Sequence, residues 1–260
     1  MIQIDAVNAF SDNYIWLIYD DQTRMAAAVD PGDAKPVERA LAEKGLQLEA
    51  ILITHHHHDH VGGIDALLVG RESLPVFGPV NRGIPQITHS LASGDRFSVL
   101  GIEFSTLEVP GHTLDHIALF STEAMADPVV FCGDTLFAGG CGRIFEGNPA
   151  MMHHSLSTLA ALPQNTRVYC AHEYTLSNLN FARAVEPENN ELLQRMAADR
   201  TLREQGTPTV PSTIALELAT NPFLRCHLPS VKAAAECHAG QPCKDISSVF
   251  ATVRSWKDNF

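Results

Sequence analysis

Short apolar runs, broken by glycine, proline and aspartate, dominate the first two-thirds of the chain. Runs of this kind, without polar alternation, are typical of strands that are covered on both faces. Periodicity alone leaves a buried helical segment open as an alternative for each run. The pattern predicts strands at residues 15–18, 25–29, 50–53, 129–132 and 168–170.

Helical signals lie between some of these runs and take over in the last third of the chain. Asp33 precedes a proline and an Ala/Leu/Glu-rich stretch that stops at Gly45, which gives a cap, a first-turn proline and a terminating glycine. Further helices are predicted over residues 187–205 and from the N-cap Asp245 onward, where apolar residues recur at helical spacing. We therefore expect an α/β core over residues 1–173 and a smaller helical domain over residues 174–260.

The bulk composition narrows the classes of protein to consider. The chain has 260 residues and a net charge of −12, so it is a poor binder of nucleic acid, whose affinity depends on neutralising phosphates. No stretch approaches the ~18 apolar residues of a membrane span. The N-terminus carries Asp5 and Asp12 instead of a basic segment followed by an apolar run, which predicts a cytoplasmic location. The six cysteines form no C-x-x-C pair and are expected to be reduced thiols.

The chemistry concentrates in the run Thr54-His55-His56-His57-His58-Asp59-His60. A solvated loop or a tag remnant would also be histidine-rich, but this run is internal, follows an apolar strand and leads into two glycines. Imidazoles and carboxylates are ligands that borderline first-row metals prefer. His55 and His57 are two positions apart, so they point the same way in an extended segment. Four ligand-type residues within six positions exceed the share of one catalytic ion, which suggests two ions.

Three further ligand candidates stand at predicted strand ends. Asp134 and His172 follow apolar runs, and His112 follows Pro110-Gly111. Each of them alone is more often a hydrogen-bonded turn residue than a ligand. Together with the histidine run they supply the number and types of ligand that two sites require.

These motifs resemble the metallo-β-lactamase superfamily and, within it, the hydroxyacylglutathione hydrolase (glyoxalase II) family. The resemblance extends from the N-terminus to the last residues. It is carried by Thr54-His55-x-His57-x-Asp59-His60 with His112, Asp134 and His172, and by Asp12-Asn13-Tyr14, Val29-Asp30-Pro31-Gly32, Gly133-Asp134-Thr135-Leu136-Phe137, Gly140-Cys141-Gly142-Arg143, Ala171-His172-Glu173-Tyr174-Thr175 and Arg254-x-x-Lys257-Asp258.

The resemblance implies an αβ/βα sandwich with a C-terminal helical domain, and it implies two divalent metal ions per chain, zinc first and iron or manganese as alternatives. His55, His57 and His112 would hold one ion, and Asp59, His60 and His172 the other. Asp134 would bridge both. Asp59 and Asp134 would then serve catalysis together with a metal-bridging hydroxide.

The substrate implied is a small-molecule glutathione thioester, S-D-lactoylglutathione, which is hydrolysed to D-lactate and glutathione in the second step of methylglyoxal detoxification. Arg143, Tyr174, Arg254 and Lys257 match the family's glutathione-contacting positions. The chain departs from the family pattern at two places: Phe145 stands where some members carry tyrosine, and Asp115 stands where glycine is usual. Asp115 either alters the field near the metal ligands or faces solvent.

Other readings of the same motifs stay open. A relative of the same fold could act on another ester, lactam or thioester. A mononuclear-iron dioxygenase that oxidises glutathione persulfide would use only His55, His57 and His112. The presence of Asp59, His60 and His172 favours the two-metal hydrolase. We expect the protein to act as a monomer, without nucleic acid or membrane partners.

Overall fold

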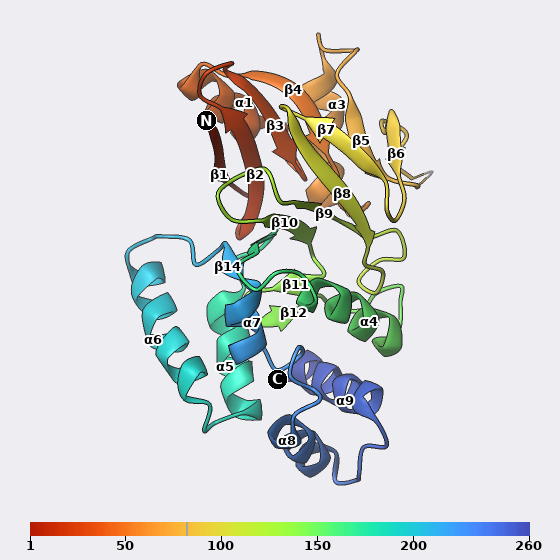
Figure 1. Ribbon diagram of the computed structural model, residues 1–260, viewed down its shortest axis with the longest axis vertical. Coiled ribbons are helices and arrows are strands. Elements are labelled where there is room, and N and C mark those ends of the chain that lie inside the picture. The colour runs from red at the N-terminus through yellow and green to blue at the C-terminus, as the bar shows by residue number, and fades with distance from the viewer. Residues whose placement is uncertain (82) are drawn as a thin grey trace. The chain divides into compact units, whose positions relative to one another are not determined.

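The computed structural model describes residues 1–81 and 83–260 (Figure 1). The chain forms two compact units. Unit 1 comprises residues 1–108, 115–133 and 169–172, and unit 2 comprises residues 109–114, 134–168 and 173–260. No helix among the described residues is both long enough and apolar enough to cross a lipid bilayer.

Strands dominate unit 1. Its helices are α1 (Ala34–Lys44), α2 (His58–Val61) and α3 (Ile64–Leu68). Its strands are β1 (Ile2–Ala9), β2 (Asn13–Asp20), β3 (Met25–Val29), β4 (Gln47–Leu52), β5 (Val76–Pro79), β6 (His89–Leu91), β7 (Arg96–Val99), β8 (Ile102–Glu108), β9 (Ile117–Ser121) and β10 (Val129–Gly133), and β13 (Arg167–Cys170) ends in this unit.

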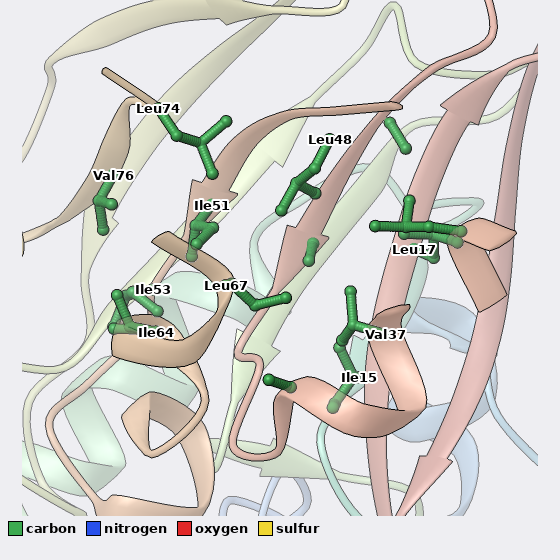
Figure 2. Packing of buried hydrophobic residues seen from close by; sticks show 14 of the residues in the cluster. Ile15, Leu17, Val37, Leu48, Ile51, Ile53, Ile64, Leu67, Leu74 and Val76 are labelled. Carbon is green, nitrogen blue, oxygen red and sulfur yellow. The ribbon is translucent and has the colours of Figure 1, made fainter. Parts of the chain in front are cut away.

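The first sheet of unit 1 has the order β1-β2-β3-β4-β5-β6. Its first pairs are antiparallel, whereas β3, β4, β5 and β6 pair in parallel. One face of the sheet packs against α1 and α3: Val37 and Leu67 from these helices join Leu17, Ile51 and Val76 in one buried cluster (Figure 2). Parallel pairing brings the carboxyl ends of β3, β4 and β5 to the same edge, so the loops that follow these strands meet there.

The second sheet of unit 1 runs β13-β10-β9-β8-β7. The ring of Trp16 on the first sheet meets Tyr169 of β13 edge to face at 4.8 Å, and Phe77 stacks on Phe97 at 4.8 Å. Aromatic pairs of this kind add to the stabilisation that apolar burial provides. The two sheets therefore share a core, as a layered sandwich requires.

Helices dominate unit 2. They are α4 (Pro149–Ala160), α5 (Thr175–Val185), α6 (Asn190–Glu204), α7 (Ile214–Thr220), α8 (Pro229–Ala239) and α9 (Ile246–Asp258). A short hairpin of β11 (Leu136–Phe137) and β12 (Gly140–Cys141) and the strand β14 (Ser212–Thr213), which pairs with the first residues of β13, complete the unit.

The predicted helix signals correspond to real caps. The Asp33 side chain accepts a hydrogen bond from the Lys35 amide, and Gly45 ends α1 in the left-handed conformation. Asp245 and Ser248 form a capping box at the start of α9. The helix predicted over residues 187–205 is shorter at its start, because Asn189 accepts from the Leu192 amide and thereby sets the cap two residues later.

Candidate metal centre and substrate pocket

Asp30 organises the sheet edge where the strands of unit 1 end. It directly follows β3, is buried, and has a φ of 53°, a conformation that residues other than glycine seldom adopt. Its Oδ1 accepts from the Thr54 amide at 2.8 Å, and its Oδ2 accepts from the Thr54 hydroxyl at 2.7 Å. The same Oδ2 lies 3.0 Å from Nδ1 of His60. One carboxylate thus orients the loop after β4 and the ring of a predicted ligand, and the local strain is stored at the site.

His55 and His57 form the first pair of donors. The segment between them is extended, with a ψ of 145° at His57, so both rings face the same side, as the sequence predicts. Nε2 of His55 lies 3.2 Å from Nδ1 of His57. Nδ1 of His55 lies 3.1 Å from the Thr54 hydroxyl, whose own proton goes to Asp30. The hydroxyl oxygen therefore accepts from His55 and directs Nε2 toward His57.

Asp59, His60 and His172 form the second group, also within unit 1. Each of the three contributes one ligand atom to a cluster whose members all lie within 4.8 Å of one another. Oδ2 of Asp59 is 3.5 Å from Nε2 of His60 and 3.4 Å from Nε2 of His172. Asn13 donates to the same Asp59 oxygen at 2.9 Å, and Asp12 accepts from Nδ1 of His172 at 2.8 Å. The Asp12-Asn13 pair thus orients two of the three donors.

His112 and Asp134 form a third set of donors, in unit 2. Nε2 of His112 lies 3.3 Å from Oδ2 of Asp134, and both side chains are buried. Nδ1 of His112 donates to the backbone carbonyl of Arg143 at 2.7 Å. Gly142 packs closely against the backbone of Asp134. A Cβ at this position would lie 1.9 Å from the Asp134 carbonyl oxygen, so glycine is required there.

The donor geometry fits bound metal. Around an ion with tetrahedral ligands at ~2.1 Å, neighbouring donor atoms are about 3.4 Å apart, close to the separations of 3.2 to 3.5 Å in the three sets. The tautomers of two histidines also fit metal binding. Nδ1 of His112 and Nδ1 of His172 each donate a hydrogen bond to an oxygen, so Nε2 of each neutral ring presents a lone pair. In both cases that lone pair faces a carboxylate, an arrangement that a cation between them stabilises.

Other residues beside the ligand candidates have contacts of their own. His116 stacks on His55 with ring centroids 4.4 Å apart, and its Nδ1 lies 3.1 Å from the Ile117 carbonyl oxygen. Gly133, with a φ of 47°, lies so close to His116 and Thr54 that a Cβ would come within 2.4 Å of the Thr54 hydroxyl. Asp115, which the sequence leaves either near the ligands or in solvent, has only 9% of its side chain exposed.

The four predicted glutathione contacts all line one pocket of unit 2, with a volume of about 300 Å³. Arg254 is buried: it donates to the Cys141 carbonyl at 3.0 Å and lies over the Phe223 ring at 5.1 Å. Lys257 lies 5.5 Å from the centroid of the Phe181 ring. The lining is completed by Phe137, Cys141, Arg143, Tyr174, Ser177, Asn178 and Asp258.

Charge makes this pocket unusual for an acidic protein. It contains three cations, Arg143, Arg254 and Lys257, against one carboxylate, Asp258, while the whole chain carries −12. Burial, and then the neighbouring Arg254 charge, lower the pKa of Lys257 from its ordinary value. Asp258 accepts from Arg254 at 3.1 Å and lies 3.5 Å from Nε of Arg143. The pocket therefore has the charge to hold a small molecule with more than one carboxylate.

Two further side chains bear on the chemistry. Burial raises the pKa of the Cys141 thiol, which argues against Cys141 as a nucleophile. Phe145 is exposed, and the centroid of its ring lies 5.3 Å from that of His112.

Sequence reasoning missed the partners of the ligands. Asp12, Asn13 and Thr54 lay inside the motifs but were given no role. The only sequence signal for these three residues was their position next to a strand end or a ligand. Asp258 and Ser177 in the pocket gave no signal of their own.

Comparison with known proteins shows the family to which the chain belongs. The metallo-β-lactamase superfamily model matches residues 14–71 and 73–172, and the model of the hydroxyacylglutathione hydrolase C-terminus matches residues 173–260. The hydroxyacylglutathione hydrolase of Pseudomonas aeruginosa strain LESB58 is 57% identical, with all of both chains covered. The chain therefore belongs to the metallo-β-lactamase superfamily and has its fold. Within that superfamily, it is a member of the hydroxyacylglutathione hydrolase family of enzymes.

Solved structures agree on the fold. ETHE1 of Myxococcus xanthus superposes with a TM-score of 0.65 at 24% identity, covering 98% of this chain and 91% of its own. TTHA1623, solved in a di-iron-bound form, superposes with a TM-score of 0.59 at 25% identity, covering 85% of this chain and 100% of its own.

Proposed function

We propose that this enzyme hydrolyses S-D-lactoylglutathione to D-lactate and glutathione, as a monomer with two divalent metal ions. The observation that carries the proposal is the double role of Arg143 in unit 2. Its carbonyl accepts from the metal-ligand candidate His112, and its guanidinium lines the cationic pocket. A thioester held in that pocket is thereby linked to the residues that hold metal.

The proposed ligand sets are those that the resemblance to the family implies. His55, His57 and His112 hold one ion, and Asp59, His60 and His172 hold the other, with Asp134 shared. Zinc is the first choice, and the di-iron form of TTHA1623 supports iron as an alternative and two ions as the number. Such ions, when bound, lower the pKa of a water ligand toward neutrality and polarise a carbonyl group.

The side chains of the protein bind the substrate and hold the metal ions. We assign residues 1–173 to catalysis and residues 174–260 to glutathione binding. Arg143, Arg254 and Lys257 bind the carboxylates of the glutathione moiety, and Tyr174 contacts its backbone. Asp59 and Asp134 serve the reaction as metal ligands. The leaving group is a thiolate from a thiol of pKa about 8.5, so no strong general acid is required.

Metal removal is expected to abolish activity. Protein stripped with a chelator should lose at least about 99% of its thioester hydrolysis, because the attacking hydroxide would come from metal-bound water, and zinc should restore the activity. The measurement is the steady-state loss of the thioester of S-D-lactoylglutathione. If fully metallated protein does not hydrolyse this substrate, the substrate assignment is wrong. Oxygen uptake with glutathione persulfide would then test the dioxygenase alternative.

Changing Lys257 to alanine is expected to raise KM about tenfold with little change in kcat, since a charge-assisted hydrogen bond contributes roughly 1.5 kcal/mol or more. Because the pKa of Lys257 is lowered, KM of the wild type should begin to rise at a lower pH than for an ordinary lysine. Lys257→Arg should remove that alkaline rise, as arginine stays charged. Lys244→Ala, at an exposed lysine of unit 2 that does not line the pocket, is the matched control, and equal KM in both alanine variants would contradict the assignment.

A further inference from the structure

Asp115 has a defined environment in unit 1. Only 9% of its side chain is exposed to solvent. It lies shortly before β9, whereas its contacts come from loops 34 and 59 residues earlier. Burying a carboxylate costs free energy unless hydrogen bonds replace those that it loses to water. The partners of Asp115 are therefore needed to keep it in this position.

Among the described residues, His56 and Asn81 both donate hydrogen bonds to the carboxylate. Oδ1 accepts from Nδ1 of His56 at 2.9 Å, and Oδ2 accepts from Nδ2 of Asn81 at 2.6 Å. The orientation of the Asn81 amide is fixed independently, because its Oδ1 accepts from the Gly83 amide at 2.6 Å. Nδ1 of His56 must carry the proton, since an ionised carboxylate can only accept.

These hydrogen bonds affect the metal ligands because of where His56 lies in the chain. His56 stands between His55 and His57, whose donor atoms are 3.2 Å apart. Fixing the ring of the middle residue restrains the backbone of both neighbours, and the spacing of two ligand atoms depends on that backbone. Asn81 follows β5 and His56 follows β4, so the carboxylate also ties the loops of adjacent parallel strands.

We propose that Asp115 is a positioning residue for the metal ligands His55 and His57, acting through a bridge formed by His56, Asn81 and Asp115. The bridge holds the ligand loop in its binding conformation and slows the loss of metal. The inference rests on the metal site of the proposed function, but not on the identity of the substrate.

The test is the rate at which zinc-loaded protein loses metal to an excess of chromogenic chelator. Asp115→Asn should lose its metal about tenfold faster than the wild type, because outer partners of metal ligands typically contribute 10- to 100-fold to affinity. The absorption spectrum of the cobalt-substituted variant should shift, which a general loss of stability would not cause. Glu103→Gln, which removes an exposed carboxylate of the same unit, should match the wild type in both measurements.

The route through His56 is tested separately. In a His56→Gln background, Asp115→Asn should accelerate metal loss by less than about twofold, because the bridge is already broken. Asn81→Ala should reproduce part of the effect, and it keeps the test available if Asp115→Asn folds poorly. Wild-type rates of metal loss in Asp115→Asn and Asn81→Ala, or an undiminished effect in the His56→Gln background, would overturn the proposal. Because no substrate is used, this failure differs from a failure to hydrolyse S-D-lactoylglutathione.

Discussion

Asp59→Asn is expected to lower kcat for thioester hydrolysis at least about 100-fold and to reduce the metal content of the purified enzyme. The oxygen that is changed lies within 3.5 Å of Nε2 of both His60 and His172, so the substitution removes the negative charge from that cluster. Loss of an outer partner costs 10- to 100-fold, and loss of a direct ligand should cost no less than the upper value. The measurements are kcat with S-D-lactoylglutathione and metal content by elemental analysis.

Asp65→Asn is the control for this experiment. Asp65 is exposed on α3, six residues further along the chain, and it accepts from Gln86. The same chemical change there should leave kcat and metal content at the wild-type level. Full activity and full metal content in Asp59→Asn would remove this residue from the ligand set.

Glu217→Ala is expected to be the most destabilising single change in unit 2. The carboxylate is fully buried and accepts from Arg195 at 2.7 Å, from the Gly139 amide at 2.8 Å and from Asn221 at 3.0 Å. Removing one partner of a buried ion pair costs about 3–5 kcal/mol, because the other charge is left uncompensated. For a chain of this size the melting temperature should fall by roughly 10 °C.

Calorimetry of the metal-loaded protein checks this expectation. Glu204→Ala, at an exposed position near the end of α6, should change the melting temperature by less than about 2 °C. A similarly small change in Glu217→Ala would mean that the buried network adds no stability. Because the Gly139 amide lies in the turn between β11 and β12, the loss should also raise KM through the pocket that this hairpin lines.

The strands of the core were predictable because their patterns are local. The run at residues 25–29 coincides with β3, and the run at residues 50–53 overlaps β4. The spacing of His55 and His57 predicted that they point the same way in an extended segment, and in the structure Nε2 of His55 lies 3.2 Å from Nδ1 of His57. Short amphipathic strands such as β7 and β8 were missed. β7 has only four residues, and the alternation of β8 breaks at Thr106, a polar residue at a buried position.

The specific contacts between the ligands and their partners could not be predicted, because the topology of the fold sets them. Asp12 and His172 are 160 residues apart in the chain, and Asp30 and Thr54 are 24 apart. A hydrogen bond at such separations leaves no period in the sequence. The same holds for the pocket: the spacing of Arg254 and Lys257 on a helix was predictable, whereas the contact of Asp258 with Arg143 required the packing of unit 2.

The buried carboxylate of Asp30 has a consequence for how the enzyme binds metal. Its contacts with Thr54 and His60 are made within the polypeptide, so folding alone aligns these groups. A ligand ring that is held in this way would need little rearrangement of the chain to bind an ion. Imidazole and carboxylate donors accept several borderline cations, and affinity alone does not select among them. The supply of ions around the newly folded chain, more than the sequence, would then decide which element it carries.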